Sequence, residues 1–275
     1  MLSDNFRGMY VFSKKSISTY IIQMTEKTIP KMVFIVPYRD REIQRRFFLR
    51  HMRYILEDYN QAEYDILIVH QQDQRDFNRG AIKNIGFLIV KEKYPDDYKG
   101  IILVFNDIDT VPCEKDLIKY ETNHEVVKHF YGYKFALGGM FSITGKDFEK
   151  TGGFPNFWGW GYEDNAMQNR CNHMKIRIDR SNSYPILDKH MIQLQDGAHR
   201  LINRNDYLHY KNNTNEGYMN IGELKYTMDE DVCTANVTYF TTGRNPSTTS
   251  RAWKDLTKTK HPFSNTRTGS MKMLL

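Results

Sequence analysis

The sequence predicts an α/β protein built on a mainly parallel β-sheet flanked by helices. Three short apolar runs rich in valine and isoleucine, at residues 31–40, 64–71 and 100–112, are typical of buried strands. Segments with helical spacing of apolar residues lie between them, at 41–59 and 77–94. Strands and helices that alternate in this way predict βαβ units, in which helical crossovers join parallel strands.

Local signals set the limits of these first elements. Pro37 stops the first strand, and Asp40 is expected to be the N-cap of the helix at 41–59, because a short carboxylate can bind the free N–H groups of the first turn. The apolar positions that roughly follow helical spacing there are Ile43, Phe47, Met52, Ile55 and Leu56. In the helix at 77–94 they are Ile82, Ile85, Leu88 and Ile89.

The alternation of strands and helices ends after the third strand. Residues 134–144 predict a strand with a glycine pair, and 145–154 a short helix closed by glycines. Residues 163–174 predict a helix with acidic residues in its first turn, where the helix dipole favours them. One or two further strands are expected within 226–242.

The length of 275 residues allows one large domain or two small ones with a sizeable core. We expect a single domain at 31–243, preceded by an extension at 1–30 and followed by a tail at 244–275. Basic residues alternate with serine and threonine in that tail, a composition typical of a solvated segment. The net charge of +6 suits an anionic ligand but is too small to indicate nucleic-acid binding.

The spacing of the cysteines and the hydropathy of the sequence indicate the cellular compartment of the protein. Cys113, Cys171 and Cys233 are widely spaced and odd in number, which favours neither a zinc site nor a disulfide framework. No apolar run approaches the roughly 18 residues of a membrane span, and the N-terminus lacks the basic-then-apolar order of a signal peptide. We therefore expect a cytoplasmic protein without a membrane span. The oligomeric state is not indicated.

Chemically active residues follow two of the strands, and ligands of open α/β sheets bind beyond such carboxyl ends. Tyr38, Arg39 and Arg41 follow the first strand, and planar guanidinium groups suit phosphate. Asp107 and Asp109 follow the third strand, where alternate residues point the same way and present two carboxylates to one spot. A divalent cation bound to phosphates favours such ligands, although a D-x-D triplet alone is equally typical of a solvated turn.

The stretch FWGWGYEDNAMQNR, residues 157–170, places Trp158 and Trp160 directly before Glu163 and Asp164. Each tryptophan is followed by glycine, and two indoles this close in sequence are difficult to bury together. We interpret both as parts of a site rather than of the core.

Taken in order, several motifs resemble the β-1,4-galactosyltransferase family of inverting glycosyltransferases with the GT-A fold, a Rossmann-like single domain. The resemblance covers roughly residues 31–242. It rests on VPYRDR (36–41), FNRGAIKNIGF (77–87), FNDIDTVP (105–112) and LGGMFSITGKDFEKTGGFPNFWGWGYEDNAMQNR (137–170).

The resemblance implies a UDP-sugar donor and Mn²⁺, or Mg²⁺, as cofactor, with Asp107 at the sugar-nucleotide and Asp109 as a metal ligand. The residues implied to bind the nucleotide or the sugar-nucleotide are Pro37, Tyr38, Arg39, Arg41, Phe77, Arg79, Gly138 and Gly139. From the residues alone, the arginines can equally be solvated surface groups and Phe77 a core side chain.

The resemblance also implies the acceptor site and the catalytic groups. Trp160 would form a mobile flap hinged at Gly159 and Gly161, and a glycan acceptor would bind there and at Tyr162, Glu163 and Asp164. Asp164 would be the general base, with Glu163 and Trp160 beside it.

One departure from the family pattern concerns the metal. The family draws further ligands from a Met-x-x-His segment; here Met191 matches, but Leu194 stands three residues later. We expect His199 to replace the histidine, with His190 as second choice; if neither does, the metal is weakly held or dispensable.

A second departure concerns the sugars. Ala136 stands where galactose-transferring members carry a tyrosine that limits room near C2 of the sugar, so UDP-GalNAc or UDP-GlcNAc should be accepted at least as well as UDP-galactose. The alternative is that Phe135 or Tyr133 fills the space. Asn165 replaces an acid found in animal members, which puts the usual GlcNAc acceptor in doubt.

Two functions remain open at this level: a glycosyltransferase, or a catalytically silent module of the same fold that binds nucleotide-sugars or glycans. The incomplete metal set favours the module, and Asp109, Glu163 and Asp164 favour the enzyme. The expected lack of an anchor differs from the Golgi-resident animal enzymes and suggests a viral or bacterial setting, or a shortened form of a longer protein.

Overall fold

The computed structural model describes residues 28–212, 215–229, 233–247, 249–258 and 263. In chain order the elements are β1 (Met32–Tyr38), α1 (Glu42–Ile55), η1 (Gln61–Glu63), β2 (Tyr64–Gln71), α2 (Arg79–Lys93), β3 (Ile102–Asn106), β4 (Thr110–Pro112), β5 (Val126–Tyr131), β6 (Met140–Thr144), α3 (Gly145–Thr151), α4 (Glu163–His173), β7 (Arg177–Asp179), β8 (Met191–Gln193), β9 (His199–Asn203), α5 (Arg204–Lys211), η2 (Tyr218–Asn220), β10 (Gly222–Asp229), β11 (Thr234–Thr241) and β12 (Arg251–Asp255). The extension predicted at 1–30 lies almost wholly outside the described residues.

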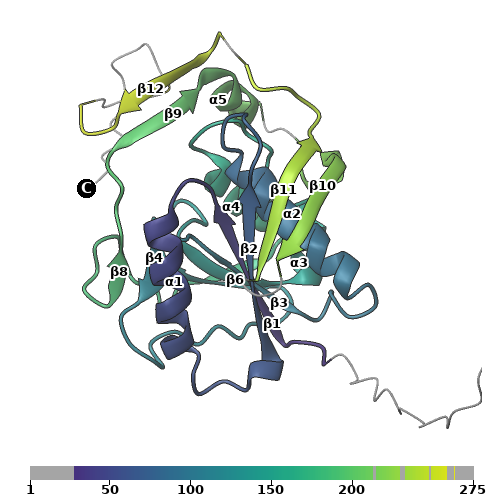
Figure 1. Cartoon of the computed structure of the whole chain (residues 1–275), viewed down its shortest axis with the longest axis vertical. Helices are drawn as coiled ribbons and strands as arrows, with labels where there is room; N and C mark the ends of the chain where they lie inside the picture. The colour runs from purple at the N-terminus through teal and green to yellow at the C-terminus, as the bar shows by residue number, and fades with distance from the viewer. Residues whose placement is uncertain (1–27, 213–214, 230–232, 248, 259–262, 264–275) are drawn as a thin grey trace, which may run out of the picture.

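An eight-stranded sheet in the order β10-β11-β2-β1-β3-β6-β5-β7 forms the centre of the molecule (Figure 1). The pairs β11–β2, β2–β1, β1–β3 and β5–β7 are parallel. The pairs β10–β11, β3–β6 and β5–β6 are antiparallel. The predicted mainly parallel sheet is therefore confirmed.

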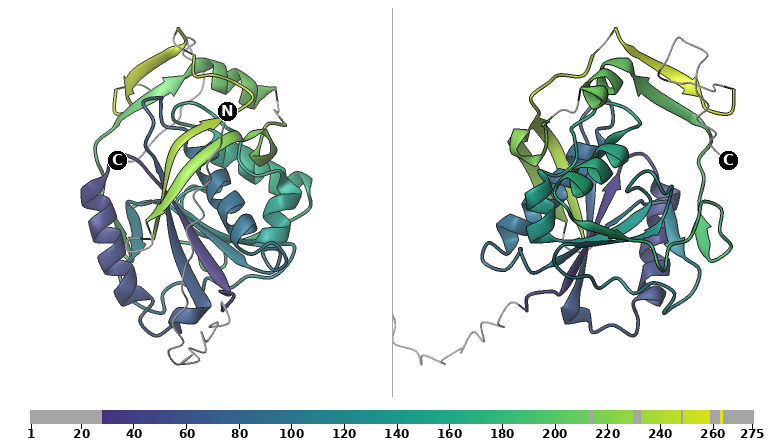
Figure 2. Two further views of the ribbon diagram at one scale, coloured as in Figure 1. Left: turned by 45° about the vertical axis from the view of Figure 1, so that its right-hand side comes forward. Right: turned by 180° about the vertical axis from the view of Figure 1, so that it is seen from behind.

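Strand β1 is buried on both of its faces, which explains its continuous apolar sequence. Val33 and Ile35 belong to the apolar cluster that contains helix α2. Phe34 and Val36 belong to the cluster on the other face, with Phe48 and other residues of α1. Figure 2 shows α1 and α2 on opposite sides of the central strands. This packing places the carboxyl ends of β1 and β3 side by side.

Two small sheets, β4–β8 and β9–β12, complete the fold. Strands β9 and β12 and helix α5 lie together at the top of Figure 1. Residues 251–255 therefore form a strand within the segment expected to be a solvated tail, because they pair antiparallel with residues 199–203. None of the helices in the described part of the chain is long and apolar enough to cross a membrane.

Other local predictions also need correction. Arg41, not Asp40, is the N-cap of α1, because Asp40 has a φ of 51° and turns the chain out of β1 before the helix begins. Ile43 is exposed rather than on the apolar face of that helix. The strand expected at 134–144 begins only at Met140, after a loop in which Gly139 has a φ of 69°.

The first turn of α2 lies so close to the backbone at Pro155 that Gly80 has no room for a side chain. A Cβ atom at Gly80 would lie 2.0 Å from the Pro155 carbonyl oxygen, so Gly80→Ala should lower the free energy of unfolding by about 1–3 kcal/mol through overpacking. Urea denaturation measures this change. Gly100→Ala is the matched control, because its nearest neighbour, the Asp97 carbonyl oxygen, would lie at 3.6 Å; equal losses in both variants would contradict the prediction.

Candidate active site

Arg79, the first residue of α2, joins three carboxylates that are distant in sequence. Its Nε donates to Glu163 Oε1 at 2.8 Å and its NH1 to Asp107 Oδ2 at 3.0 Å, while its NH2 pairs with Asp164 Oδ2. The helix start is anchored by Asn78, whose side chain accepts from Ala81 N and donates to the Asn156 carbonyl. The end of β3 and the start of α4 are thereby held against α2.

Lys83, one turn further along α2, adds a second buried cation to this group. Its Nζ lies 3.1 Å from Asp164 Oδ1 and 3.8 Å from Asp107 Oδ1. The sequence analysis did not single out Lys83. Its spacing of four residues from Arg79 was the available signal, since residues i and i+4 share a helix face.

Burial and the neighbouring charges shift the pKa values of these acids in different directions. Burial alone would raise the pKa of Asp107, but Arg79, Lys83 and Arg41 outweigh it, and this pKa lies below its usual value. Burial, together with the charge of Asp107, raises the pKa of Asp109. Burial likewise raises the pKa of Glu163 despite the neighbouring Arg79. Burial alone would lower the pKa of Arg79, but the three carboxylates raise it well above its usual value.

Asp109 faces a different cation from Asp107. Arg41 NH1 donates to Asp109 Oδ2 at 2.8 Å, and Thr110 Oγ1 donates to Oδ1 at 3.0 Å. Both acids of the D-x-D triplet thus lie at the carboxyl end of β3, as predicted, and each is bound to a guanidinium group.

The other predicted metal ligands do not gather around Asp109. No group of three or more His, Cys, Asp or Glu residues within the described ranges is placed to hold a metal ion. His190 Nδ1 bonds to Asp188 at 2.7 Å, and Met191 is buried in the apolar core. The His199 side chain is 69% exposed and lies 4.0 Å from Asp255. The ligands expected from the sequence, Asp109 and Met191 with either His199 or His190, therefore stay a prediction.

Strand geometry explains the exposed position of His199. Successive residues of β9 point to opposite sides, so the exposed His199 is followed by Arg200, whose side chain is only 21% exposed. Arg200 NH2 lies 3.4 Å from Asp196 Oδ1. Burial lowers the pKa of Arg200, and the charges of Asp196, Arg41 and Asp109 act on it as well. Arg200 thus approaches the site, and the sequence analysis missed it.

The residues predicted to line the nucleotide pocket lie at the ends of β1 and β2. Pro37 and Tyr38 are buried, and the Tyr38 ring packs on His70 with 4.6 Å between centroids. Arg39 donates to the Arg75 carbonyl. Phe77 is partly buried against the core, and its carbonyl accepts from Gly159 N at 3.2 Å.

The glycine pair at 138–139 lies against the acids. Asp107 N donates to the Gly139 carbonyl at 2.9 Å, and a Cβ atom at Gly138 would lie 2.6 Å from Asp164 Oδ2. His129 Nε2 bonds to the Gly138 carbonyl at 3.0 Å, and burial, with Arg180 nearby, lowers the pKa of His129 to about 4. A neutral histidine therefore holds this loop in place.

The two rings proposed to fill the space beside Ala136 pack against each other. Phe135 is 52% exposed and stacks on Tyr133, with ring centroids 5.0 Å apart. Ala136 itself is buried.

The two tryptophans have different environments. Trp158 is 1% exposed, stacks on Phe240 and donates its Nε1–H to the Arg244 carbonyl, so its interpretation as a site residue is wrong. The indole is buried because strand β11 and the Arg244 segment, distant in sequence, cover it. Trp160 is half-buried, and its backbone N–H donates to the Leu201 carbonyl at 2.7 Å.

Glycines on both sides of Trp160 have positive φ, 117° at Gly159 and 113° at Gly161. The Trp160 ring stacks on Phe263, and a Cβ atom at Gly161 would lie 2.4 Å from the Phe263 ring. Tyr162 packs against Phe263 and against two tyrosines of α5, Tyr207 and Tyr210. Gly161 N donates to Glu163 Oε2 at 3.1 Å, which ties this segment to the acids.

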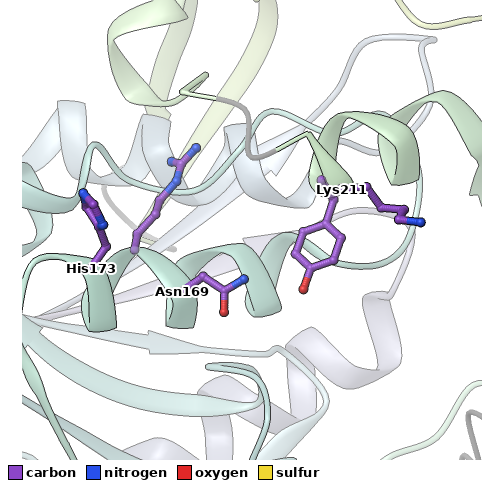
Figure 3. Close-up of a pocket in the computed structure, with 5 residues that line it drawn as sticks. Asn169, His173 and Lys211 are labelled. Atoms are coloured by element: carbon purple, nitrogen blue, oxygen red, sulfur yellow. The ribbon is translucent and has the colours of Figure 1, made fainter.

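A separate pocket of about 540 Å³ lies between α4 and α5 (Figure 3). It is lined by Asn169, Arg170, His173, Tyr210 and Lys211. None of these residues was predicted to belong to the site.

Comparison with known proteins agrees with this geometry. The chain is 32% identical to β-1,4-galactosyltransferase 4 of Cricetulus griseus over 57% of its own length and 46% of that protein. It is 30% identical to xylosylprotein 4-beta-galactosyltransferase of Caenorhabditis elegans over 68% of its length and 64% of that protein. The chain thus spans about half to two thirds of the length of these relatives.

Two family models match consecutive parts of the chain. The N-terminal region of glycosyl transferase group 7 matches residues 23–123, and the N-terminal domain of galactosyltransferase matches residues 120–193. Together they cover more than half of the sequence. The chain belongs to the β-1,4-galactosyltransferase family.

A solved structure supports the family's GT-A-like fold for this chain. The catalytic domain of Drosophila β-1,4-galactosyltransferase 7 in complex with xylobiose superposes with a TM-score of 0.59 at 20% identity, over 79% of this chain and 96% of that one. A mutant of the same enzyme has been solved with manganese, UDP-Gal and xylobiose.

Asp206 on α5 gives this galactosyltransferase-family protein a predicted pH dependence. Burial, opposed by Arg244, raises the pKa of Asp206 to about 7. Because the folded pKa lies above the usual 3.8, the stabilising contribution is complete below about pH 3.8 and is lost as the pH rises through about 7.

Relative to Asp206→Asn, the free energy of unfolding of the unmodified protein should fall by about 2–3 kcal/mol between pH 5 and pH 8. Urea denaturation of both proteins at the two pH values measures this. The exposed Asp97→Asn variant should follow the unmodified protein; a pH-independent difference for Asp206→Asn would contradict the assignment.

Proposed function

We propose that the protein is an inverting glycosyltransferase that moves a hexose or N-acetylhexosamine from a UDP-sugar to a hydroxyl group of a glycan acceptor. The observation that carries this proposal is the group formed by Arg79, Glu163, Asp164 and Asp107 at the carboxyl end of the sheet. Membership of the β-1,4-galactosyltransferase family and the UDP-Gal and xylobiose bound to the Drosophila relative support the choice of substrates.

Asp164 is the general base of this proposal. It accepts the proton of the acceptor hydroxyl while that oxygen bonds to the anomeric carbon, and the bond from that carbon to the diphosphate breaks, so the configuration changes from α to β. Arg79 and Lys83 orient the carboxylate, one on each oxygen. General base catalysis of this kind contributes about 10²–10⁴-fold. Glu163, bonded to Arg79 and to Gly161 N, positions the acceptor segment.

Trp160, Gly161 and Tyr162 are proposed to form the acceptor wall. The half-buried indole and its flanking glycines can present an aromatic face to a sugar, since each glycine has a backbone conformation that other residues rarely adopt. The nucleotide is proposed to lie across Pro37, Tyr38, Arg39, Arg41 and Phe77, with the Gly138–Gly139 loop beneath the sugar.

Asp109 offers a carboxylate to a divalent cation, but within the described residues no group of three or more His, Cys, Asp or Glu is placed to hold a metal ion. No step of the proposed transfer passes through a metal ion. The incomplete set also favours the alternative, a silent nucleotide-sugar-binding protein of the same fold, and a turnover measurement decides between the two.

Asp164→Asn should abolish UDP release from a UDP-sugar in the presence of sugar acceptors, because the amide cannot accept the hydroxyl proton. A loss of at least about 10²-fold is expected, measured by UDP detection across a panel of donors and acceptors. Asp96→Asn, on the exposed surface, is the control and should retain activity. Equal turnover in the two variants would exclude Asp164 as the base; no turnover of any donor by the unmodified protein would favour the silent module.

Donor choice follows from the small side chain of Ala136. In direct competition, UDP-GalNAc or UDP-GlcNAc should be used at least as well as UDP-galactose, and Ala136→Tyr should shift preference toward UDP-galactose by filling the space near C2. Rates of product formation from mixed donors measure this. Strict preference of the unmodified protein for UDP-galactose would contradict the prediction.

A further inference from the structure

The position opposite Asp109 in the β4–β8 pair holds an aliphatic residue. Thr110 is paired with Gln193, and Leu194 N donates to the Asp109 carbonyl at 2.8 Å, so Leu194 stands directly across from Asp109. Side chains of directly opposed residues share one face of an antiparallel pair. A ligand placed here would complete a metal site with Asp109, but the leucine side chain has no donor atom.

Beside Asp109 lies a row of side chains with alternating negative and positive charge. Arg41 NH1 is 2.8 Å from Asp109 Oδ2, and Arg41 Nε is 2.7 Å from Asp196 Oδ2. Asp196 Oδ1 is in turn 3.4 Å from Arg200 NH2. Arg200 NH1 donates to the carbonyls of Gly197 and His199 at 2.9 Å each, which fixes its direction. Asp196 thus joins the two guanidinium groups, and Asp109 binds the first of them.

This arrangement has the charge and the shape that a diphosphate requires. Two guanidinium groups carry the same total charge as one divalent cation, and each presents planar donors that match phosphate oxygens. Neither Arg41 nor Arg200 is fully buried, at 27% and 21% exposed, so a ligand can reach both. A guanidinium group has five N–H donors, so a diphosphate can bind donors that Asp109 and Asp196 do not use, while these carboxylates keep both groups in position.

We propose that Arg41 and Arg200, positioned by Asp109 and Asp196, bind the diphosphate of the UDP-sugar and supply the positive charge that a metal ion supplies in the Drosophila relative, so that transfer requires no divalent metal. This inference rests on the proposed function. In the transfer step the two guanidinium groups stabilise the negative charge that collects on the departing diphosphate as the anomeric C–O bond breaks.

The first test measures binding of UDP and of uridine by calorimetry in the presence of EDTA. The unmodified protein should bind UDP without metal, and Arg200→Gln should weaken UDP binding by about ten- to a hundred-fold, the effect of losing a charged hydrogen bond. Uridine, which lacks phosphate, should bind equally to both proteins. Arg46→Gln is the matched control, because Arg46 lies on α1 and is 78% exposed.

The second test introduces a metal-binding side chain at position 194. Leu194→His should create a manganese site with Asp109, seen by electron paramagnetic resonance as a loss of free Mn²⁺ without nucleotide, and adding Asp109→Asn should remove it. The unmodified protein should leave Mn²⁺ free under the same conditions.

The outcomes separate this inference from the proposed function. UDP binding that requires Mn²⁺, tight Mn²⁺ binding by the unmodified protein alone, or unchanged UDP affinity in Arg200→Gln overturns the guanidinium assignment. Transfer that occurs only with Mn²⁺ overturns the inference and leaves the proposed function intact. Metal-free, Arg200-dependent UDP binding without transfer of any sugar supports the guanidinium site and overturns the proposed function.

Discussion

The ion pairs of Arg79 are the contacts on which the rest of the site depends. One guanidinium group meets carboxylates from the end of β3 and from the first turn of α4, and a buried charge is costly unless it is paired. Removing Arg79 would leave Asp107, Glu163 and Asp164 close together with Lys83 and the more distant Arg41 to balance them. The position of α2 against the sheet, set by its apolar face, therefore decides where this charged group can form.

Close backbone approaches keep this charged group compact. Gly80 lets α2 reach Pro155, and Gly138 lets its loop reach Asp164 Oδ2. His129 supports the same loop through the Gly138 carbonyl and stays neutral because burial disfavours its charged form. The Gly138–Gly139 loop, the acids of α4 and the first turn of α2 are thus linked by contacts that leave little room for side chains. In such a site the chemistry depends on small residues as much as on charged ones.

Much of the fold was predictable because its central elements have strong local patterns. The apolar runs of β1, β2 and β3 and the helical spacing in α2 needed no tertiary information. The short strands β7, β8 and β9 have three to five residues each and are partly exposed, so hydrophobic periodicity could not reveal them. The strand β12 was missed for a related reason, since its polar sequence becomes a strand only by pairing with β9.

The sequence indicated that Asp107 lies at the end of a buried strand, and the family resemblance singled out Glu163 and Asp164; the structure brings all three to Arg79. The candidate site was not predictable where orientation decides. His199 and Arg200 are neighbours, and the alternation of side chains along β9 turns the arginine, not the histidine, toward the site. Trp158 and Trp160 are separated by one glycine, yet β11 covers only the first.

By itself, the sequence determined the parallel βαβ core, the family and the acids of the site, because apolar periodicity and a dense motif are properties of short stretches of chain. Only the tertiary structure decided which cation faces which carboxylate. Arg79, Lys83, Arg41 and Arg200 come from α2, the start of α1 and β9, and their distances to the acids depend on how those elements pack. The ion pairs that link them join residues far apart in the chain, and no local pattern encodes such a separation.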